Sequence, residues 1–144
     1  MPDNSGEYVI VVGCGRVGAE LATTLSAEGQ SVVVIDREMD AFERLGEAFT
    51  GATIFGNAMD EEVLVSAGMN HADAVVTATQ GDNTNIMIGQ MAKTLFGVKR
   101  VVVRCYDPVR SDTYAALGLK TVCPTRIGAQ IMRDSLLESA DKCS

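Results

Sequence analysis

Three glycines and one aspartate have the types and spacing from which a phosphate- and ribose-binding site is built. Gly13, Gly15 and Gly18 form a G-x-G-x-x-G pattern, and Asp36 follows eighteen residues after the last of them. In such a pattern the first glycine permits a tight turn, the second lets the backbone approach a phosphate, and the third lets a helix lie close to the sheet. The unpaired N–H groups of that helix attract the phosphate, and the carboxylate accepts hydrogen bonds from a ribose diol. The pattern therefore predicts nucleotide binding.

The elements needed to position these residues surround them in the required order. An apolar run of strand length at 8–12 precedes the first glycine, a helical pattern at 16–28 follows, and a second apolar run at 31–35 ends in the aspartate. Glycine triplets also occur as plain tight turns, so the order of strand, loop, helix, strand and acid is what favours a nucleotide site over a structural turn.

Beyond these elements the chain alternates between strand and helix patterns. Apolar runs and helical periodicity predict strands at 51–56, 73–78, 99–103 and 119–122, and helices at 39–48, 60–67, 82–96, 108–117 and 125–138. Six βα repeats predict a parallel sheet with helices on both faces. Right-handed crossovers then give a Rossmann-like, doubly wound α/β fold of three layers with strand order 3-2-1-4-5-6. We expect residues 1–7 to be a disordered leader and 8–140 to be one domain.

Composition excludes several classes of partner. The chain has 144 residues, 47% hydrophobic and 22% charged, and a net charge of −7, which argues against nucleic acid and against an anionic membrane surface. No apolar run approaches the ~20 residues of a membrane span, and the polar, acidic N-terminus is unlike a signal peptide. We therefore expect a cytoplasmic protein without direct membrane insertion.

The cysteines and the histidine do not form a catalytic or metal-binding pattern. Cys14, Cys105, Cys123 and Cys143 show neither C-x-x-C nor metal-ligand spacing, so we interpret them as buried small hydrophobes and predict no metal site. His71, the single histidine, falls in a predicted turn. No Ser/His/Asp or Cys/His site can be assembled around it, so no catalytic residue is predicted.

In a sheet of this order, ligands bind outside the carboxyl ends of the strands, where the strand order reverses. The cleft then receives Gly13, Cys14, Gly15, Arg16, Val17 and Gly18 after the first strand, Asp36 and Arg37 after the second, Asn57 and Ala58 after the third, Thr79, Gln80 and Gly81 after the fourth, Arg104 after the fifth, and Thr125 and Arg126 after the sixth. Arg16, Arg104 and Arg126 are either solvated surface charges or forked contacts to phosphate oxygens.

The residues after the second and third strands face the adenosine end of this cleft. Asp36 favours a free 2′-hydroxyl over a 2′-phosphate, although Arg37 stands beside it. Arg37 either lies flat against adenine or is a cation at the rim. Asn57 and Ala58 either meet the adenine through amide and backbone groups, or Asn57 is an ordinary turn residue with left-handed geometry.

With the cleft assembled, the chain resembles the TrkA-N family, also called the RCK or KTN nucleotide-binding domain of potassium channels and transporters. The resemblance covers about residues 8–138. It rests on V-I-V-V-G-C-G-R-V-G at 9–18, V-V-V-I-D-R at 32–37, G-N-A-M-D at 56–60, A-D-A-V-V-T-A-T at 72–79, G-D-N-T-N at 81–85, V-V-V-R at 101–104 with Asp107-Pro108 after it, and L-G-L-K-T-V-C-P-T at 117–125.

The resemblance implies a regulatory subunit without enzymatic activity that gates a membrane potassium transporter or channel. It further implies binding of AMP, ADP, ATP or NAD(H), assembly as a homodimer or a larger ring, and a cytoplasmic position at the inner face of the cell membrane through the membrane partner. By the same analogy, phosphates are held by Gly13, Gly15, Arg16 and Gly18, the ribose by Asp36, the adenosine side by Arg37, Asn57 and Ala58, and the phosphate tail by Arg104.

Two departures from the family pattern affect these expectations. Members that bridge phosphates through a divalent ion can carry Glu after the sixth strand, where this chain has Thr125-Arg126, which argues against metal-assisted triphosphate binding. The family's C-terminal lobe has no counterpart, so either this chain is a piece of a longer protein or that lobe resides on another polypeptide. The final amphipathic helix, 126–138, either contacts a dimer mate or partner or packs on its own sheet.

Two other functions are alternatives to gating. An NAD-dependent oxidoreductase, or its cofactor-binding half, needs a second wall for substrate and a group that manages the proton. Neither is visible, and Tyr106 and Tyr114 lack the Tyr-x-x-x-Lys spacing of short-chain dehydrogenases. A structural domain with a decayed nucleotide site is the third reading, and the intact glycines and Asp36 oppose it.

Overall fold

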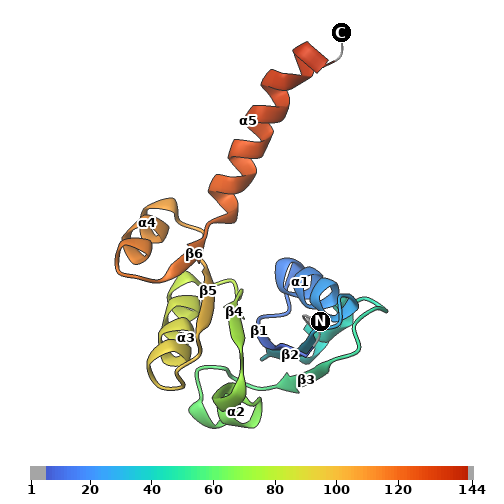
Figure 1. The fold of residues 1–144 in the computed structure, drawn as a ribbon, viewed down its shortest axis with the longest axis vertical. Coiled ribbons are helices and arrows are strands. Elements are labelled where there is room, and N and C mark those ends of the chain that lie inside the picture. The colour runs from blue at the N-terminus through green and yellow to red at the C-terminus, as the bar shows by residue number, and fades with distance from the viewer. Residues whose placement is uncertain (1–5, 143–144) are drawn as a thin grey trace.

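A parallel sheet forms the centre of the protein (Figure 1). The structure, a computed structural model, describes residues 6–142. Within them the strands are β1 (Tyr8–Val12), β2 (Ser31–Asp36), β3 (Ala52–Phe55), β4 (Ala74–Thr77), β5 (Arg100–Arg104) and β6 (Lys120–Val122). Every neighbouring pair is parallel and the order is β3-β2-β1-β4-β5-β6, which confirms the predicted Rossmann-like sheet.

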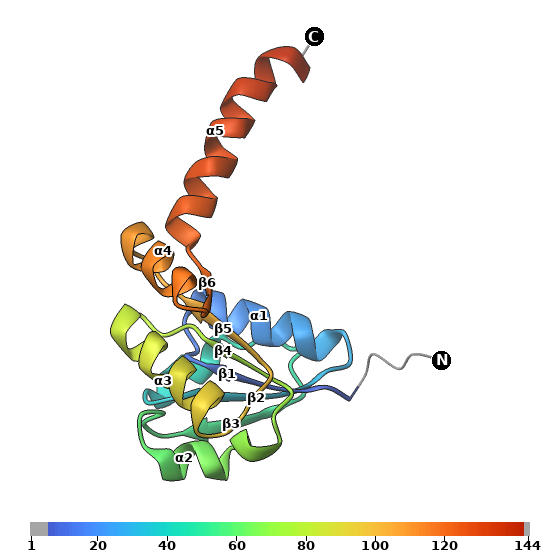
Figure 2. The same ribbon diagram turned by 60° about the vertical axis from the view of Figure 1, so that its left-hand side comes forward.

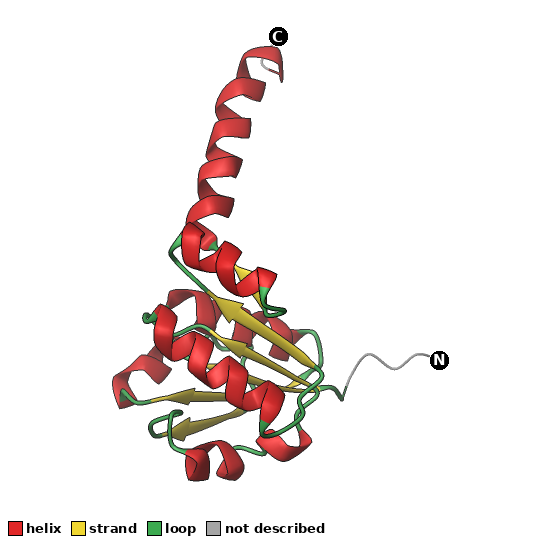
Figure 3. Ribbon diagram, turned by 90° about the vertical axis from the view of Figure 1, so that its left-hand side faces the viewer, coloured by secondary structure: helices red, strands yellow, loops and turns green. Residues whose placement is uncertain are grey.

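Helices cover both faces of this sheet and give three layers (Figures 2 and 3). They are α1 (Arg16–Ala27), the 3-10 segment η1 (Met39–Arg44), α2 (Glu61–Ser66), the short 3-10 turn η2 (Met69–His71), α3 (Asp82–Thr94), α4 (Pro108–Ala116) and α5 (Pro124–Lys142). One face packs against α1 and η1, and the other packs against α2, η2, α3 and α4.

The two-sided burial of the central strands explains their continuous apolar sequences. Residues 9–12 of β1 and 32–35 of β2 are all buried. Ile10, with the strand residues on the same face of the sheet, shares a core with Leu64 and Ile88. Val11, with the strand residues on the opposite face, shares the other core with α1. These two strands face helices on both sides and expose little to water, which leaves their sequences apolar. Each predicted strand begins and ends within about one residue of the observed one.

Capping residues begin two of the helices where the sequence predicts. The Asp60 carboxylate accepts a hydrogen bond from the N–H of Glu62 at 2.9 Å, and the Asp107 carboxylate accepts one from Val109 at 3.0 Å. Each side chain pairs an N–H group that the first helical turn leaves without a partner. Pro108 occupies the first turn of α4, where its missing N–H is harmless.

The helix predicted at 39–48 is wrong in length and type. The segment is a 3-10 helix over Met39–Arg44 and is extended at Leu45, with ψ of 135°. Gly46 stands within the predicted range, and glycine disfavours a helix by about 1 kcal/mol relative to alanine. Its N–H instead donates to the Thr23 hydroxyl of α1 at 3.1 Å, so a tertiary contact replaces the next helical turn.

The last helix does not fold back onto its own sheet. Figures 1 to 3 show α5 leaving the end of β6 and projecting away from the domain. Its large apolar side chains are between 48% and 74% exposed, and they are Ile127, Ile131, Met132, Leu136 and Leu137. Neither this helix nor any other in the described part of the chain has the length and hydropathy that crossing a membrane requires.

The segment predicted as a leader is described only at its end. Residues 1–5 of it lie outside the described part of the chain. The carbonyl of Glu7 accepts a hydrogen bond from Ser31 at 2.9 Å, and its carboxylate pairs with Arg100 at 2.6 Å. The chain is therefore tied to the amino ends of the strands from Glu7 onward.

Candidate nucleotide-binding site

A pocket of about 900 Å³ opens at the carboxyl ends of the strands, where the order reverses between β1 and β4. Of the predicted site residues, Gly13, Cys14, Gly15, Arg16, Val17, Asp36, Arg37, Asn57, Ala58, Thr79, Gln80, Gly81 and Arg104 line it. Gly18 lies beneath the loop rather than on the pocket wall. The sequence rule therefore located the pocket, while the binding role of each residue stays a prediction.

The three glycines of the loop are needed for different reasons. Gly13 has φ of +106°, and a Cβ there would lie 2.7 Å from the carbonyl oxygen of Ala78. A Cβ on Gly18 would lie 1.8 Å from the Gly13 carbonyl oxygen, so this glycine lets α1 sit against the loop. A Cβ on Gly15 would meet nothing within 4 Å. The first and third glycines thus serve the fold, and the second keeps space open.

That open space lies in front of the first turn of α1. Gly15 is the N-cap of this helix, makes no side-chain capping bond, and is followed by a first turn without acidic residues. The initial N–H groups of a helix carry partial positive charge and lack partners within the helix. An anionic oxygen in the pocket is the partner that this geometry suits.

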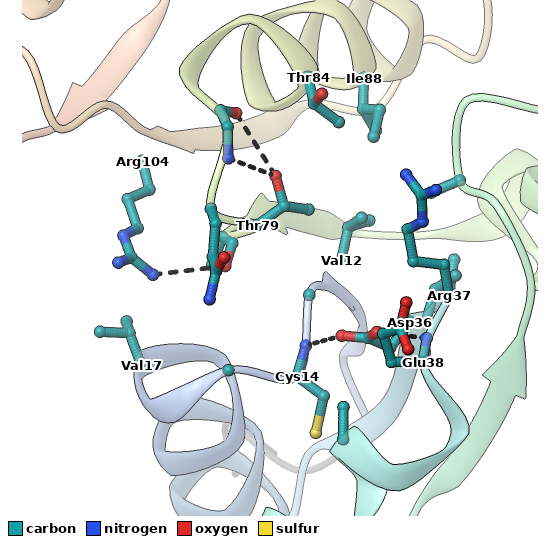
Figure 4. A pocket seen from close by; sticks show the side chains of 18 of the residues that line it. Val12, Cys14, Val17, Asp36, Arg37, Glu38, Thr79, Thr84, Ile88 and Arg104 are labelled. Atoms are coloured by element: carbon teal, nitrogen blue, oxygen red, sulfur yellow. Dashed lines mark hydrogen bonds between the residues drawn. The ribbon is translucent and has the colours of Figure 1, made fainter.

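Asp36 is held in place by the backbone at the opposite side of the loop (Figure 4). One carboxylate oxygen accepts the Cys14 N–H and the other accepts the Glu38 N–H, both at 2.7 Å. Each oxygen retains a second acceptor position, so the carboxylate can still accept two hydroxyl groups. This fixed orientation suits a ribose diol.

Arg104 is a cation with an unsatisfied donor in the pocket wall (Figure 4). Its guanidinium lies 4.0 Å from the centre of the Tyr106 ring, and one terminal nitrogen makes a long contact of 3.4 Å to the Ala78 carbonyl. The buried Nε has no hydrogen-bond partner. Burial lowers the pKa of this guanidinium, against the opposing effect of the Asp82 carboxylate. Arginine stays charged in proteins, so an anion that pairs with its terminal nitrogens would offset the desolvation.

A fully buried asparagine, Asn85, ties the chain after β4, at Thr79, to the end of β5, at Arg104. The Asn85 Oδ1 accepts from the N–H and hydroxyl of Thr79 at 2.8 and 2.6 Å, and its Nδ2 donates to the carbonyls of Thr79 and Arg104, each at 3.0 Å. Asn85 is 0% exposed. Its amide uses two donors and two acceptor positions, and it ties the ends of β4 and β5 together.

Arg126 does not line the pocket, where the strand-end rule placed it, and of the two alternatives for its side chain the structure shows a surface charge and not a cation at the phosphate end. It begins α5 and makes a forked ion pair with Asp112 at 2.7 and 3.1 Å. This contact lowers the pKa of Asp112. The forked partner of this guanidinium is therefore a carboxylate on α4 and not a phosphate.

At the adenosine end of the pocket, Asn57 differs in part from what the sequence predicts. Asn57 Oδ1 accepts from the N–H of Met59 at 2.9 Å, so this side chain stabilises a turn. The backbone of Asn57 does not have the predicted left-handed conformation, since only glycines among the described residues have positive φ. Arg37 is exposed beside Asp36 at this end (Figure 4).

Two further residues with useful chemistry line the pocket and were not predicted from the sequence. Arg44, in η1, lines the pocket and approaches the Cys14 carbonyl at 3.4 Å. Tyr106, two residues beyond β5, forms the platform under Arg104. Both lie past the first residue after a strand, and a search for charged and aromatic residues further along these loops would have found them. Among the described residues no three His, Cys, Asp or Glu side chains are grouped so as to hold a metal ion.

A parallel sheet of this order, with a glycine loop and a ribose-type carboxylate at its reversal point, defines a Rossmann-like domain of the nucleotide-binding class. The TrkA-N domain family matches residues 9–124. That match covers most of the chain, and the protein belongs to the TrkA-N family.

A curated potassium uptake protein and a solved RCK domain are similar to this chain. The Trk system potassium uptake protein TrkA of Streptomyces coelicolor is 41% identical over 132 residues, which cover 92% of this chain and 59% of that protein. The crystal structure of the GsuK RCK domain is 25% identical with a TM-score of 0.79, covering 95% of this chain and 29% of that one. The chain thus spans little more than half of this curated relative.

Two further GsuK structures contain nucleotides. The GsuK channel bound to NAD has a TM-score of 0.80 at 24% identity, covering 96% of this chain and 24% of that one. GsuK bound to ADP has a TM-score of 0.76 at 25% identity, covering 90% and 34%. These matches confirm the RCK-type, Rossmann-like fold.

Proposed function

We propose that this chain is a regulatory domain, without catalytic activity, that binds an adenine nucleotide or NAD(H) and thereby gates a potassium-transporting membrane protein. The observation that carries the proposal is the pairing of open space at the first turn of α1 with the backbone-held carboxylate of Asp36. The potassium-transport part of the proposal is supported by the names of the relatives. The domain then works in the cytoplasm, at the inner face of the membrane, through its partner.

The distance across the pocket favours a ligand with more than one phosphate. Asp36 ends β2 and Arg104 ends β5, and these strands are separated by β1 and β4. Neighbouring strands lie about 4.8 Å apart, so the two residues are separated by roughly 14 Å across the sheet. The Arg104 side chain covers part of this distance, because its guanidinium contacts the Ala78 carbonyl beside Gly13, so it can meet a first phosphate and any phosphate beyond it. ADP, ATP and NAD(H) extend further, so we rank them above AMP.

Calorimetric titration of the purified chain with AMP, ADP, ATP, NAD+ and NADH tests this proposal. We expect one site per chain and at least 10-fold tighter binding of ADP or NADH than of AMP. A regulatory ligand needs to favour one state by only about 1–3 kcal/mol, so micromolar affinity suffices. Failure of all five to bind would end the proposal, and turnover of NADH with a small carbonyl compound would replace it with an oxidoreductase.

Arg104→Ala is expected to weaken ADP binding by about 10- to 100-fold, since a charge-assisted bond in a desolvated site is lost. AMP binding should weaken less than ADP binding, because AMP offers this residue only one phosphate. The matched control is Arg126→Ala, which removes an arginine bonded to Asp112 outside the pocket and should leave both affinities unchanged. Equal losses for AMP and ADP would refute the assignment of Arg104 to the phosphate tail. Titration calorimetry measures all four values.

We further propose that α5 mediates association with a second copy of the chain. The helix α5 projects from the domain (Figure 1), and its residues Ile127, Ile131 and Met132 are exposed. Val76 and Val102, on the α1 side of the sheet, are also only half-buried. A second copy can cover apolar surface that one copy leaves exposed, and such surface drives association.

Sedimentation velocity at about 100 μM checks this association. We expect a dimer or larger ring for the wild type and a monomer for the Ile131→Asp, Met132→Asp double variant, because buried unpaired carboxylates oppose association. Gln130→Asp, on an exposed position of the same helix, is the control and should still associate. A monomeric wild type would contradict the proposal, whatever its nucleotide affinity.

A further inference from the structure

Two thiols outside the nucleotide site lie next to each other at the carboxyl ends of β5 and β6. Cys105 is 0% exposed and Cys123 is 5% exposed, and both are free. Cys105 directly follows β5, and Cys123 lies between β6 and the start of α5. No role in nucleotide binding is assigned to either side chain, so their proximity needs its own explanation.

The strand register brings the two residues opposite each other. Arg104 pairs with Val122 in the parallel ladder, and the N–H of Cys105 donates to the Val122 carbonyl at 2.9 Å. The next position on each strand is a cysteine. In-register neighbours on adjacent strands are about 4.8 Å apart, which falls inside the range of about 4.4–6.8 Å between the Cα atoms of disulfides.

The side chains also point to the same side of the sheet. The Cys105 thiol donates to the Asp107 carbonyl at 3.6 Å, and the Cys123 thiol donates to the Tyr106 carbonyl at 3.4 Å. These acceptors belong to consecutive residues, so the two sulfur atoms contact the same short loop. Burial and the Asp82 carboxylate raise the pKa of Cys105, and the neighbouring Cys123 adds to that effect.

We propose that Cys105 and Cys123 form a reversible disulfide when the protein meets a hydroperoxide. The sulfur of Cys123, the less buried of the two residues, attacks the peroxide, the O–O bond breaks, and a sulfenic acid and one water (or alcohol) form. The Cys105 sulfur then attacks that sulfenic sulfur, a second water leaves with the thiol proton, and the S–S bond forms. Two thiols have lost two electrons, which the peroxide has gained. A dithiol reverses the reaction by exchange.

The bond would act at the root of α5. The carbonyl of Cys123 accepts the Ile127 N–H at 3.0 Å in the first turn of that helix. A covalent link from this residue to the end of β5 fixes where α5 leaves the sheet. It also draws the Cys123 sulfur away from the Tyr106 carbonyl, next to the platform under Arg104.

Peptide mapping of the full chain tests the proposal. The protein is treated with hydrogen peroxide, blocked with an alkylating reagent under denaturing conditions, and digested with trypsin. Residues 105–110 and 121–126 are separate tryptic peptides, so the disulfide appears as one linked pair that dithiothreitol separates. We expect this pair in the wild type and in Cys143→Ser, and not in Cys105→Ala or Cys123→Ala. Wild-type protein in which both peptides remain alkylated, or link to Cys14 or Cys143 instead, overturns the proposal.

Amide hydrogen exchange tests the consequence for α5. Exchange of the amides at 125–128 is expected to be at least 3-fold slower in the oxidised protein than in the reduced protein, because the root of the helix is held at both ends. Equal exchange in the two forms would show that the bond does not restrain α5. Neither readout depends on nucleotide, so failure here is separate from failure of the proposed function.

Discussion

Gly15→Asp is expected to abolish nucleotide binding and leave the fold as stable as the wild type. Nothing lies within 4 Å of a Cβ at this position, and φ of −79° suits any residue. Aspartate is also a preferred N-cap and exceeds glycine there by a few tenths of a kcal/mol. The added carboxylate would bond the free N–H groups of α1 and repel a phosphate. We expect at least 100-fold weaker ADP binding, which equals about 2.7 kcal/mol, with an unchanged melting temperature.

Two comparisons make this prediction specific. Gly18→Ala should lower the melting temperature substantially, because its Cβ would lie 1.8 Å from the Gly13 carbonyl oxygen. Thr24→Asp adds the same charge to an exposed position near the other end of α1 and should bind ADP as the wild type does. Titration calorimetry and thermal denaturation supply both quantities. Normal ADP affinity in a folded Gly15→Asp protein would mean that the phosphate lies elsewhere.

Asn85→Ala is expected to destabilise the fold by about 3–5 kcal/mol. The substitution leaves the Thr79 N–H and the Thr79 and Arg104 carbonyls without their buried partner. Each unsatisfied buried group costs about 1–3 kcal/mol, and partial relaxation keeps the total below the sum. The melting temperature should fall by roughly 10–15 °C. ADP binding to the remaining folded protein should weaken, because the backbone of both pocket loops loses its tie.

Asn83→Ala is the matched control on the same helix. Asn83 is exposed, and its Oδ1 accepts one hydrogen bond from Arg110 at 3.2 Å. Its removal should change stability by no more than about 0.5 kcal/mol. Urea denaturation compares the two variants. Similar small effects for both would show that the Asn85 bonds do not hold the ends of β4 and β5.

The fold and the position of the pocket could be predicted from the sequence because several strong local signals agreed with one another. Val9 to Val12 must be apolar on both faces of the sheet, which leaves a continuous run that can be recognised. Asp60 and Asp107 have the residue type and place of helix caps, and they serve as caps. Gly13 and Gly18 are each forced by a backbone contact, so their spacing follows from the fold itself.

The features that could not be predicted depend on tertiary contacts, which the spacing of residues in the sequence does not determine. Arg126 follows the last strand, as the rule for pocket residues requires, but Asp112 on the preceding helix captures its side chain. The helix predicted at 39–48 ends early because the Gly46 N–H bonds to Thr23 on a distant helix. The apolar residues of α5 were recognised as a face, yet helical periodicity cannot tell an intramolecular partner from a second chain.

The structure also suggests how a bound phosphate could affect the end of the domain. Arg104 lies on Tyr106, and the Tyr106 carbonyl accepts from Cys123 at the root of α5. A ligand that moves Arg104 would therefore act on residues adjoining that helix. Regulation through this contact requires a difference of only about 1–3 kcal/mol between the two states.

The most direct measurement is a crystal structure of the chain grown with ADP, and another grown with NAD. We expect a phosphate oxygen to accept hydrogen bonds from the N–H groups that follow Gly15, the ribose diol to bond to Asp36, and the Arg104 guanidinium to donate to the phosphate tail. A ligand bound elsewhere, with the Gly15 loop and Asp36 facing solvent at saturating concentration, would contradict this expectation.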